Sequence, residues 1–185
     1  MTSLTISARL NARFTSLLIS LSVIAAALLS DLNSSAAQSL DIKLDSSVSS
    51  GLMIGPNGRE VSLRRAPLYL DFDAIFIFDG DQSIEWVLGS ILQTEYTPGF
   101  AFNPQVRLRR KWSVFEMFAG VGLPFFIQPY TRFGTELSLG GSMPTSSSLA
   151  LIGQVSVQTF FMGSDLPDDH TVISVNGSLG VRMRF

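Results

Sequence analysis

The feature of this sequence that most limits its fold is an alternation of apolar and polar residues with a period of two. The alternation is clearest in residues 68–78, where one face carries Phe72 and Phe76 and the other carries Asp71 and Asp73. Successive side chains of a β-strand point to opposite faces, whereas helical spacing would scatter the same residues around an axis. The segment therefore predicts a strand with one strongly apolar face.

The same alternation recurs to the end of the chain. We expect eight strands, over residues 40–45, 68–78, 85–95, 100–109, 115–128, 132–140, 149–161 and 173–185. A repeat of about 18 residues is longer than that of a soluble sandwich, and it suits membrane-spanning strands of about 9–11 residues with one connection each. The predicted fold is all-β, an eight-stranded antiparallel up-and-down barrel. Two connections, 49–64 and 163–170, are long enough to form sizeable surface loops.

The size of the side chains decides which face of the predicted strands lies inside. Phe, Leu and Trp dominate the apolar face, and the interior of an eight-stranded barrel is barely wide enough for side chains to fill it. The polar face, with its Ser, Gly and Gln residues and scattered charges, is small enough to fit. We therefore expect a transmembrane barrel with lipid outside and a polar lumen. A soluble periplasmic barrel that binds an apolar ligand is the alternative, with the faces reversed.

The first residues have the pattern of an export signal. Arg9 and Arg13 precede an apolar stretch at 14–29, and Ala37 ends a small-residue site of the kind that signal peptidase cleaves. An uncleaved anchor is the alternative, because the stretch approaches the ~17–20 residues that span a bilayer. The expected parts are a signal peptide, 1–37, cleaved near Ala37, and a barrel domain, 38–185.

Composition excludes several classes of protein. The chain has 185 residues, of which 46% are hydrophobic and 15% charged, a net charge of −2 and no cysteine. It is too apolar to be disordered. Without cysteine it has no disulfide, no thiolate metal site and no lipid attached through a thiol. No basic surface predicts nucleic-acid binding, and we expect no cofactor.

The end of the chain carries the one family resemblance. The last eight residues resemble the C-terminal assembly signal of bacterial outer-membrane barrels, which has a polar residue, a glycine two positions on, and hydrophobic residues at the third-last and last positions. Those four places are taken by Ser178, Gly180, Met183 and Phe185. Together with the leader and the alternating strands, they make the chain resemble small barrels of the OmpA/OmpX type. The resemblance implies a monomer in the outer membrane with periplasmic termini, in contact with lipid and inserted by the barrel assembly machinery.

Charged residues on the polar face form the main candidate site. In a narrow lumen single charges are costly, whereas paired charges neutralise each other, so we predict a plug of salt bridges; a narrow conduction path is the alternative. Its predicted members are Asp71, Asp73, Glu85, Glu95, Arg107, Arg109, Glu116, Arg132, Glu136, Arg182 and Arg184. Arg110 and Trp112 are predicted to anchor the barrel at the membrane interface.

Other chemistry is weakly supported. His170 and Ser174 are the residues to weigh for a lipid-modifying hydrolase, but strand spacing separates them by about 13 Å, so a surface histidine is the better interpretation. The acidic residues of the last connection fit an ordinary loop better than a cation or metal site; they are Asp165, Asp168 and Asp169. We therefore expect a non-enzymatic outer-membrane barrel that contributes to envelope integrity or surface interaction, with a narrow pore as the alternative.

Overall fold

The protein was studied as a computed structural model that describes residues 40–57, 60–78, 83–164, 166 and 170–185. The expected signal peptide lies outside these described residues, as does the acidic cluster of the last connection. Among the described residues no helix is long and apolar enough to cross a membrane. Residues Ser39–Phe185 form one compact unit.

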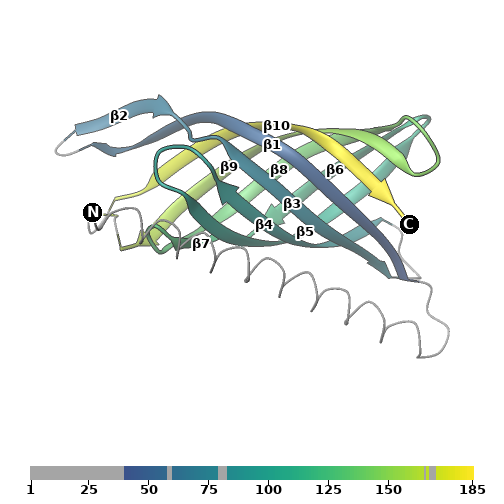
Figure 1. Ribbon diagram of the computed structural model, residues 1–185, viewed down its shortest axis with the longest axis horizontal. Coiled ribbons are helices and arrows are strands. Elements are labelled where there is room, and N and C mark those ends of the chain that lie inside the picture. The colour runs from purple at the N-terminus through teal and green to yellow at the C-terminus, as the bar shows by residue number, and fades with distance from the viewer. Residues whose placement is uncertain (1–39, 58–59, 79–82, 165, 167–169) are drawn as a thin grey trace, which may run out of the picture. The chain divides into compact units, whose positions relative to one another are not determined.

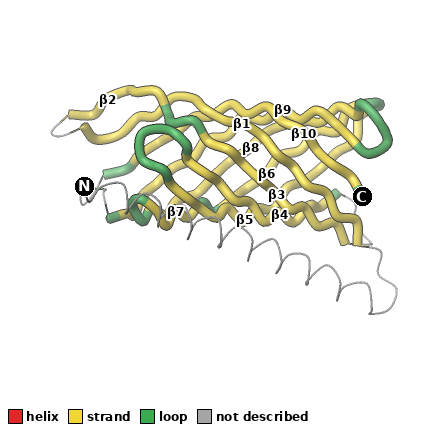
Figure 2. Tube along the Cα trace, in the orientation of Figure 1, coloured by secondary structure: helices red, strands yellow, loops and turns green. Residues whose placement is uncertain are grey.

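That unit is a closed antiparallel barrel (Figures 1 and 2). Its strands are β1 (Leu40–Asn57), β2 (Glu60–Arg65), β3 (Tyr69–Phe78), β4 (Ile84–Gln93), β5 (Gly99–Trp112), β6 (Phe115–Gly122), β7 (Phe125–Gln128), β8 (Arg132–Pro144), β9 (Leu149–Gly163) and β10 (Val172–Arg184). Neighbours in sequence pair with one another, and β10 pairs with β1 to close the barrel.

The ten strands form eight barrel strands, two of which are interrupted. β2 and β3 are two parts of one barrel strand, separated by a bend at Ala66-Pro67-Leu68. β6 and β7 are likewise two parts of one barrel strand, separated at Leu123-Pro124. Proline has no backbone N–H to donate to a neighbouring strand, which explains an interruption at each of these places. The predicted eight-stranded antiparallel barrel is confirmed.

The first strand of the barrel, β1, differs from the prediction. We expected a strand over residues 40–45 and a surface loop over 49–64, but β1 continues to Asn57 and forms a hairpin with β2, in which Leu52 lies opposite Arg65. The serines and glycine of residues 46–51 resemble a loop in sequence, yet they lie in register with β10. In Figure 1 the hairpin extends from the end of the barrel opposite the C-terminus. We call these the hairpin end and the C-terminal end.

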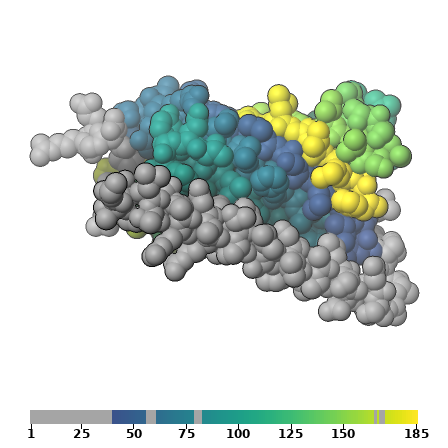
Figure 3. All heavy atoms as spheres, viewed as in Figure 1, coloured from purple at the N-terminus to yellow at the C-terminus, as the bar shows by residue number. Residues whose placement is uncertain are grey.

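Large apolar side chains cover the outside of the barrel. Exposed examples come from every part of the wall and include Phe72, Trp86, Leu137, Val155 and Leu179. Polar and charged residues occupy the interior, which reverses the arrangement of a soluble ligand-binding barrel. Figure 3 shows β1 and β10 side by side on one face of the molecule, as their pairing requires.

Candidate functional site

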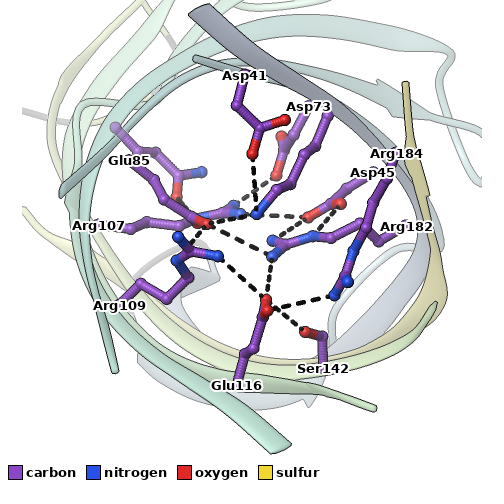
Figure 4. Close-up of polar contacts among 12 residues, drawn as sticks. Asp41, Asp45, Asp73, Glu85, Arg107, Arg109, Glu116, Ser142, Arg182 and Arg184 are labelled. Carbon is purple, nitrogen blue, oxygen red and sulfur yellow. Dashed lines mark hydrogen bonds and ion pairs between the residues drawn. The ribbon is translucent and has the colours of Figure 1, made fainter. Parts of the chain in front are cut away.

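A cluster of charged side chains lies inside the barrel (Figure 4). It is in the half of the lumen nearest the C-terminal end, because Asp45 and Arg182 pair near the end of β10. Residues two apart on a strand point to the same side, so the alternation that builds the wall also directs these side chains inward. Strand register then brings opposite charges together. Asp45 of β1 lies directly opposite Arg182 of β10, and Glu85 of β4 lies opposite Arg107 of β5.

Arg182 lies at the centre of this cluster and is 0% exposed. Its Nε donates to Asp45 Oδ1 at 2.7 Å and its Nη2 donates to Asp45 Oδ2 at 2.8 Å. Two parallel charge-assisted bonds of this kind are strong and fix the relative orientation of the two groups. Its Nη1 faces Glu85 Oε1 at 3.6 Å and Glu116 Oε2 at 3.8 Å.

Arg107 forms a second buried centre. It donates to Asp73, to Gln105 Oε1 at 3.0 Å and to Asp45 Oδ2 at 3.4 Å. The guanidinium carbon of Arg107 also lies 4.9 Å from the centre of the buried ring of Phe118, a cation–π contact. The face of the ring thus adds to the stabilisation of the Arg107 charge inside the lumen.

The remaining ion pairs balance the charge of the cluster. Glu85 is fully buried and faces Lys43 Nζ at 3.8 Å and Arg109 Nε at 3.4 Å. Glu116 faces Arg109 and Arg184, each at 3.4 Å. The cluster contains five acidic and five basic side chains, which are Asp41, Asp45, Asp73, Glu85, Glu116, Lys43, Arg107, Arg109, Arg182 and Arg184.

Four residues predicted for the charge network lie apart from this cluster. Asp71 and Glu136 are farther along the lumen towards the hairpin end, and Arg132 is the first residue of β8 at that end. Glu95 was expected inside the lumen, but it lies beyond the end of β4. The prediction had also omitted Asp45, although the alternation of β1 places it on the same face as Lys43.

Glu95 pairs with Arg65 at the rim of the barrel. Its Oε2 accepts hydrogen bonds from Arg65 Nη2 and from the backbone N–H of Leu68 at 3.0 Å. The hydrogen bond from Arg65 lowers the pKa of Glu95 below its ordinary 4.5. A lowered folded-state pKa means that the pair stabilises the fold above the ordinary pKa, and that this contribution is lost as pH falls through the folded-state value. The effect is small because Arg65 is exposed and Glu95 is partly exposed, so that water screens the pair.

The middle of the lumen is polar and nearly full. Glu136 Oε2 accepts hydrogen bonds from Asn103 Nδ2 at 2.9 Å and Gln158 Nε2 at 2.7 Å. Asp71 accepts a long bond from Ser47 at 3.5 Å. A cavity of about 30 Å³ lies among these residues, which is room for about two water molecules. Within the described part of the chain, no three Asp, Glu or His side chains are close enough together to hold a metal ion.

Apolar side chains close the lumen towards the hairpin end. This apolar cap consists of Met53, Ala66, Tyr69, Ile91, Ala101, Phe126, Phe160 and Val172. The ring centres of Phe126 and Phe160 are 5.6 Å apart in an edge-to-face arrangement. In the sequence, Ile91 appeared only as a break in the alternation. A period of two assigns residues to the inner or outer face by their polarity, so it does not identify an apolar side chain that lies on the inner face.

The other predicted residues lie at the surface or in the wall. Ser178 and Gly180 are on the lumen side of β10, whereas Met183 and Phe185 face outward. Arg110 and Trp112 are exposed at the end of β5, and Trp112 is on the outer face. His170 is exposed, while Ser174 is fully buried and donates to Asn176 Oδ1 at 2.9 Å.

The fold and the inverted polarity define a class, the small eight-stranded barrels of the outer-membrane type. Neisserial surface protein A has a similar crystal structure, with a TM-score of 0.59 and 12% sequence identity over 81% of this chain and 100% of that chain. The solution NMR structure of the de novo designed protein TMB2.3 matches with a TM-score of 0.43 and 12% identity over 76% of this chain and 95% of that one. OprG from Pseudomonas aeruginosa matches with a TM-score of 0.36 and 10% identity over 79% and 95% of the two chains.

No family model matches the sequence, and no curated protein matches it. At 12% identity the likeness to Neisserial surface protein A concerns the fold. The resemblance to small outer-membrane barrels that the sequence suggested is confirmed at that level.

Proposed function

We propose that this chain is an integral outer-membrane barrel whose lumen is plugged, and that it serves envelope integrity or surface interaction without catalysing a reaction. The observation that carries the proposal is the placement of charge. Arg107 and Arg182 are 1% and 0% exposed, respectively, inside a wall whose outer surface is apolar. Such a surface is stable against lipid, and such a lumen holds no continuous water path.

Export and assembly complete the proposal. Residues 1–37 act as a signal peptide that is cleaved near Ala37, and both ends of the mature chain lie in the periplasm. The barrel assembly machinery reads the last strand through Ser178, Gly180, Met183 and Phe185. Lipid is the main partner of the monomeric barrel, and Arg110 and Trp112 anchor it at the interface.

The first prediction concerns conductance. The purified wild-type barrel in planar lipid bilayers is expected to give no stable single-channel current, because the cluster leaves no path for hydrated ions. The triple variant Arg107→Ser/Arg182→Ser/Phe118→Ser replaces both central arginines and the phenylalanine ring with small side chains. It is expected to conduct if it folds. Arg65→Ser at the rim is the matched control and is expected to stay silent. A steady wild-type current that Arg107→Ser alone changes would overturn the plug and favour the narrow pore.

The second prediction concerns membrane depth. Trp86 and Trp112 are the only tryptophans, and both are exposed on the outer face. Trp86 lies opposite Val106, six residues before Trp112 along β5, which corresponds to about 20 Å along the strand and about 15 Å of depth at the tilt of a barrel strand. In vesicles of lipids brominated deep in the acyl chains, Trp86 in a Trp112→Phe variant is expected to be quenched strongly.

The complementary variant, Trp86→Phe, leaves Trp112 as the reporter. Its fluorescence is expected to be quenched mainly by lipids brominated near the headgroup. If neither tryptophan responds to any brominated lipid, the protein does not insert in the bilayer and the proposed location is wrong.

A further inference from the structure

Two acidic side chains in the middle of the lumen have no basic partner. In the described part of the chain, every ion pair inside the lumen belongs to the balanced cluster near the C-terminal end, and none includes Asp71 or Glu136. Glu136 is 3% exposed and Asp71 is partly buried. A buried carboxylate without a counter-charge is costly, so these two groups are neutralised either by protons or by a cation.

The two carboxylates and their surroundings line a small polar cavity. The cavity of about 30 Å³ has both of them in its wall, together with Ser47, Ser49, Asn103 and Gln158. Tyr69 and Phe126 of the apolar cap lie on one side of it, and Asp45 and Asp73 of the charged cluster lie on the other. The space suits an ion with one water molecule and excludes a larger organic cation.

An unpaired amide oxygen supplies independent evidence for a ligand. Asn103 is 3% exposed, and its Oδ1 has no hydrogen-bond partner among the described residues. Because its Nδ2 donates to Glu136 Oε2, the orientation of the amide is set and the oxygen remains available. A buried acceptor without a partner is costly, and a cation that accepts its lone pair removes that cost.

We propose that this cavity binds one hard cation, with Asp71 and Glu136 as the charged ligands and Asn103 Oδ1 as a neutral ligand. Carboxylate, amide and hydroxyl oxygens are the donors that Na⁺ and Ca²⁺ prefer. Two carboxylates with neutral oxygens form a site without the third acidic ligand that a stronger metal centre would need. The inference concerns the interior of the barrel and does not depend on the proposed physiological role.

The test compares barrels refolded in different salts, so that each sample meets one known cation throughout folding. The purified mature protein is stripped of metal in urea and refolded into detergent with NaCl, CaCl₂, MgCl₂ or choline chloride at equal ionic strength. Saturation of the site by Na⁺ or Ca²⁺ is expected to raise the melting temperature by about 5 °C or more over choline. Elemental analysis after gel filtration of the Ca²⁺ sample, or a ²³Na resonance broadened by the protein, identifies which ion is bound.

Variants decide where that ion binds. In Asp71→Asn/Glu136→Gln the difference between salts is expected to disappear, whereas Glu95→Gln, which removes a partly exposed carboxylate at the rim, is expected to keep it. Equal melting temperatures of the wild type in all four salts would overturn the proposal and mean that the two groups are neutralised by protons. A difference that persists in the double variant would also overturn it, because the ion would then bind at the surface. Should the double variant not fold, Asn103→Leu gives the same comparison.

Discussion

Replacing Arg182 by methionine is expected to lower the free energy of unfolding by about 3–5 kcal/mol, the usual cost of removing one partner from a buried ion pair. The change removes two hydrogen bonds to Asp45, of 2.7 and 2.8 Å. It also removes one of the two arginines that face both Glu85 and Glu116, so that Arg109 alone is left between these carboxylates. Urea unfolding of the refolded barrel, followed by tryptophan fluorescence, measures the difference.

Arg184→Met is the matched control for this substitution. Arg184 lies two residues farther along β10, is more exposed and forms one ion pair, to Glu116 at 3.4 Å. Its loss is expected to cost clearly less than the loss of Arg182. If the two variants unfold at the same urea concentration, the central position of Arg182 adds nothing to the free energy of unfolding. The ion pairs of the cluster then act independently of one another, as exposed pairs do.

Replacing Gly180 by valine is expected to prevent or severely weaken closure of the barrel. A Cβ at Gly180 would lie 2.1 Å from the backbone oxygen of Ser46 and 2.5 Å from Cβ of Ser47. Both contacts are with β1, so the closing pair of strands would have to separate. Overpacking of this kind costs about 3 kcal/mol or more when backbone has to move. Heat-modifiable migration on gels and circular dichroism after refolding in detergent report the folded fraction.

Gly177→Val in the same strand is the control, since a Cβ at Gly177 meets nothing within 4 Å. Valine favours strands at both positions, so only the clash distinguishes the two variants. Refolding in detergent uses no assembly machinery. If Gly180→Val refolds as well as Gly177→Val and fails only in cells, Gly180 acts through recognition of the last strand and the packing argument is wrong.

Much of the fold could be predicted because the lipid-facing side of each strand has to be apolar along its whole length. Residues 68–78 became β3 (Tyr69–Phe78) almost unchanged. β1 was missed beyond residue 45 because Ser46, Ser47 and Gly51 have weak strand preferences when taken alone. Their conformation is imposed by pairing with β10, which is distant in sequence, and for Ser46 and Ser47 also by pairing with β3.

The candidate site could be predicted in kind but only partly in detail. Alternation showed that Arg107, Glu116 and Arg182 face inward. It could not show how high each side chain lies along the barrel axis, because that height depends on the stagger between strands. For this reason Glu95 was grouped with residues that lie at the opposite end, and the separation of Asp71 and Glu136 from the basic side chains was not visible.

The pairing of Asp45 with Arg182 has a consequence for synthesis of the protein. These residues are 137 positions apart, so nearly the entire barrel has to be made before the aspartate meets its arginine. A chain that ends before β10 lacks Arg182 and leaves one side of β1 without its neighbouring strand. β1 therefore gains its second neighbouring strand, and Asp45 its two-bond partner, only once β10 has been made.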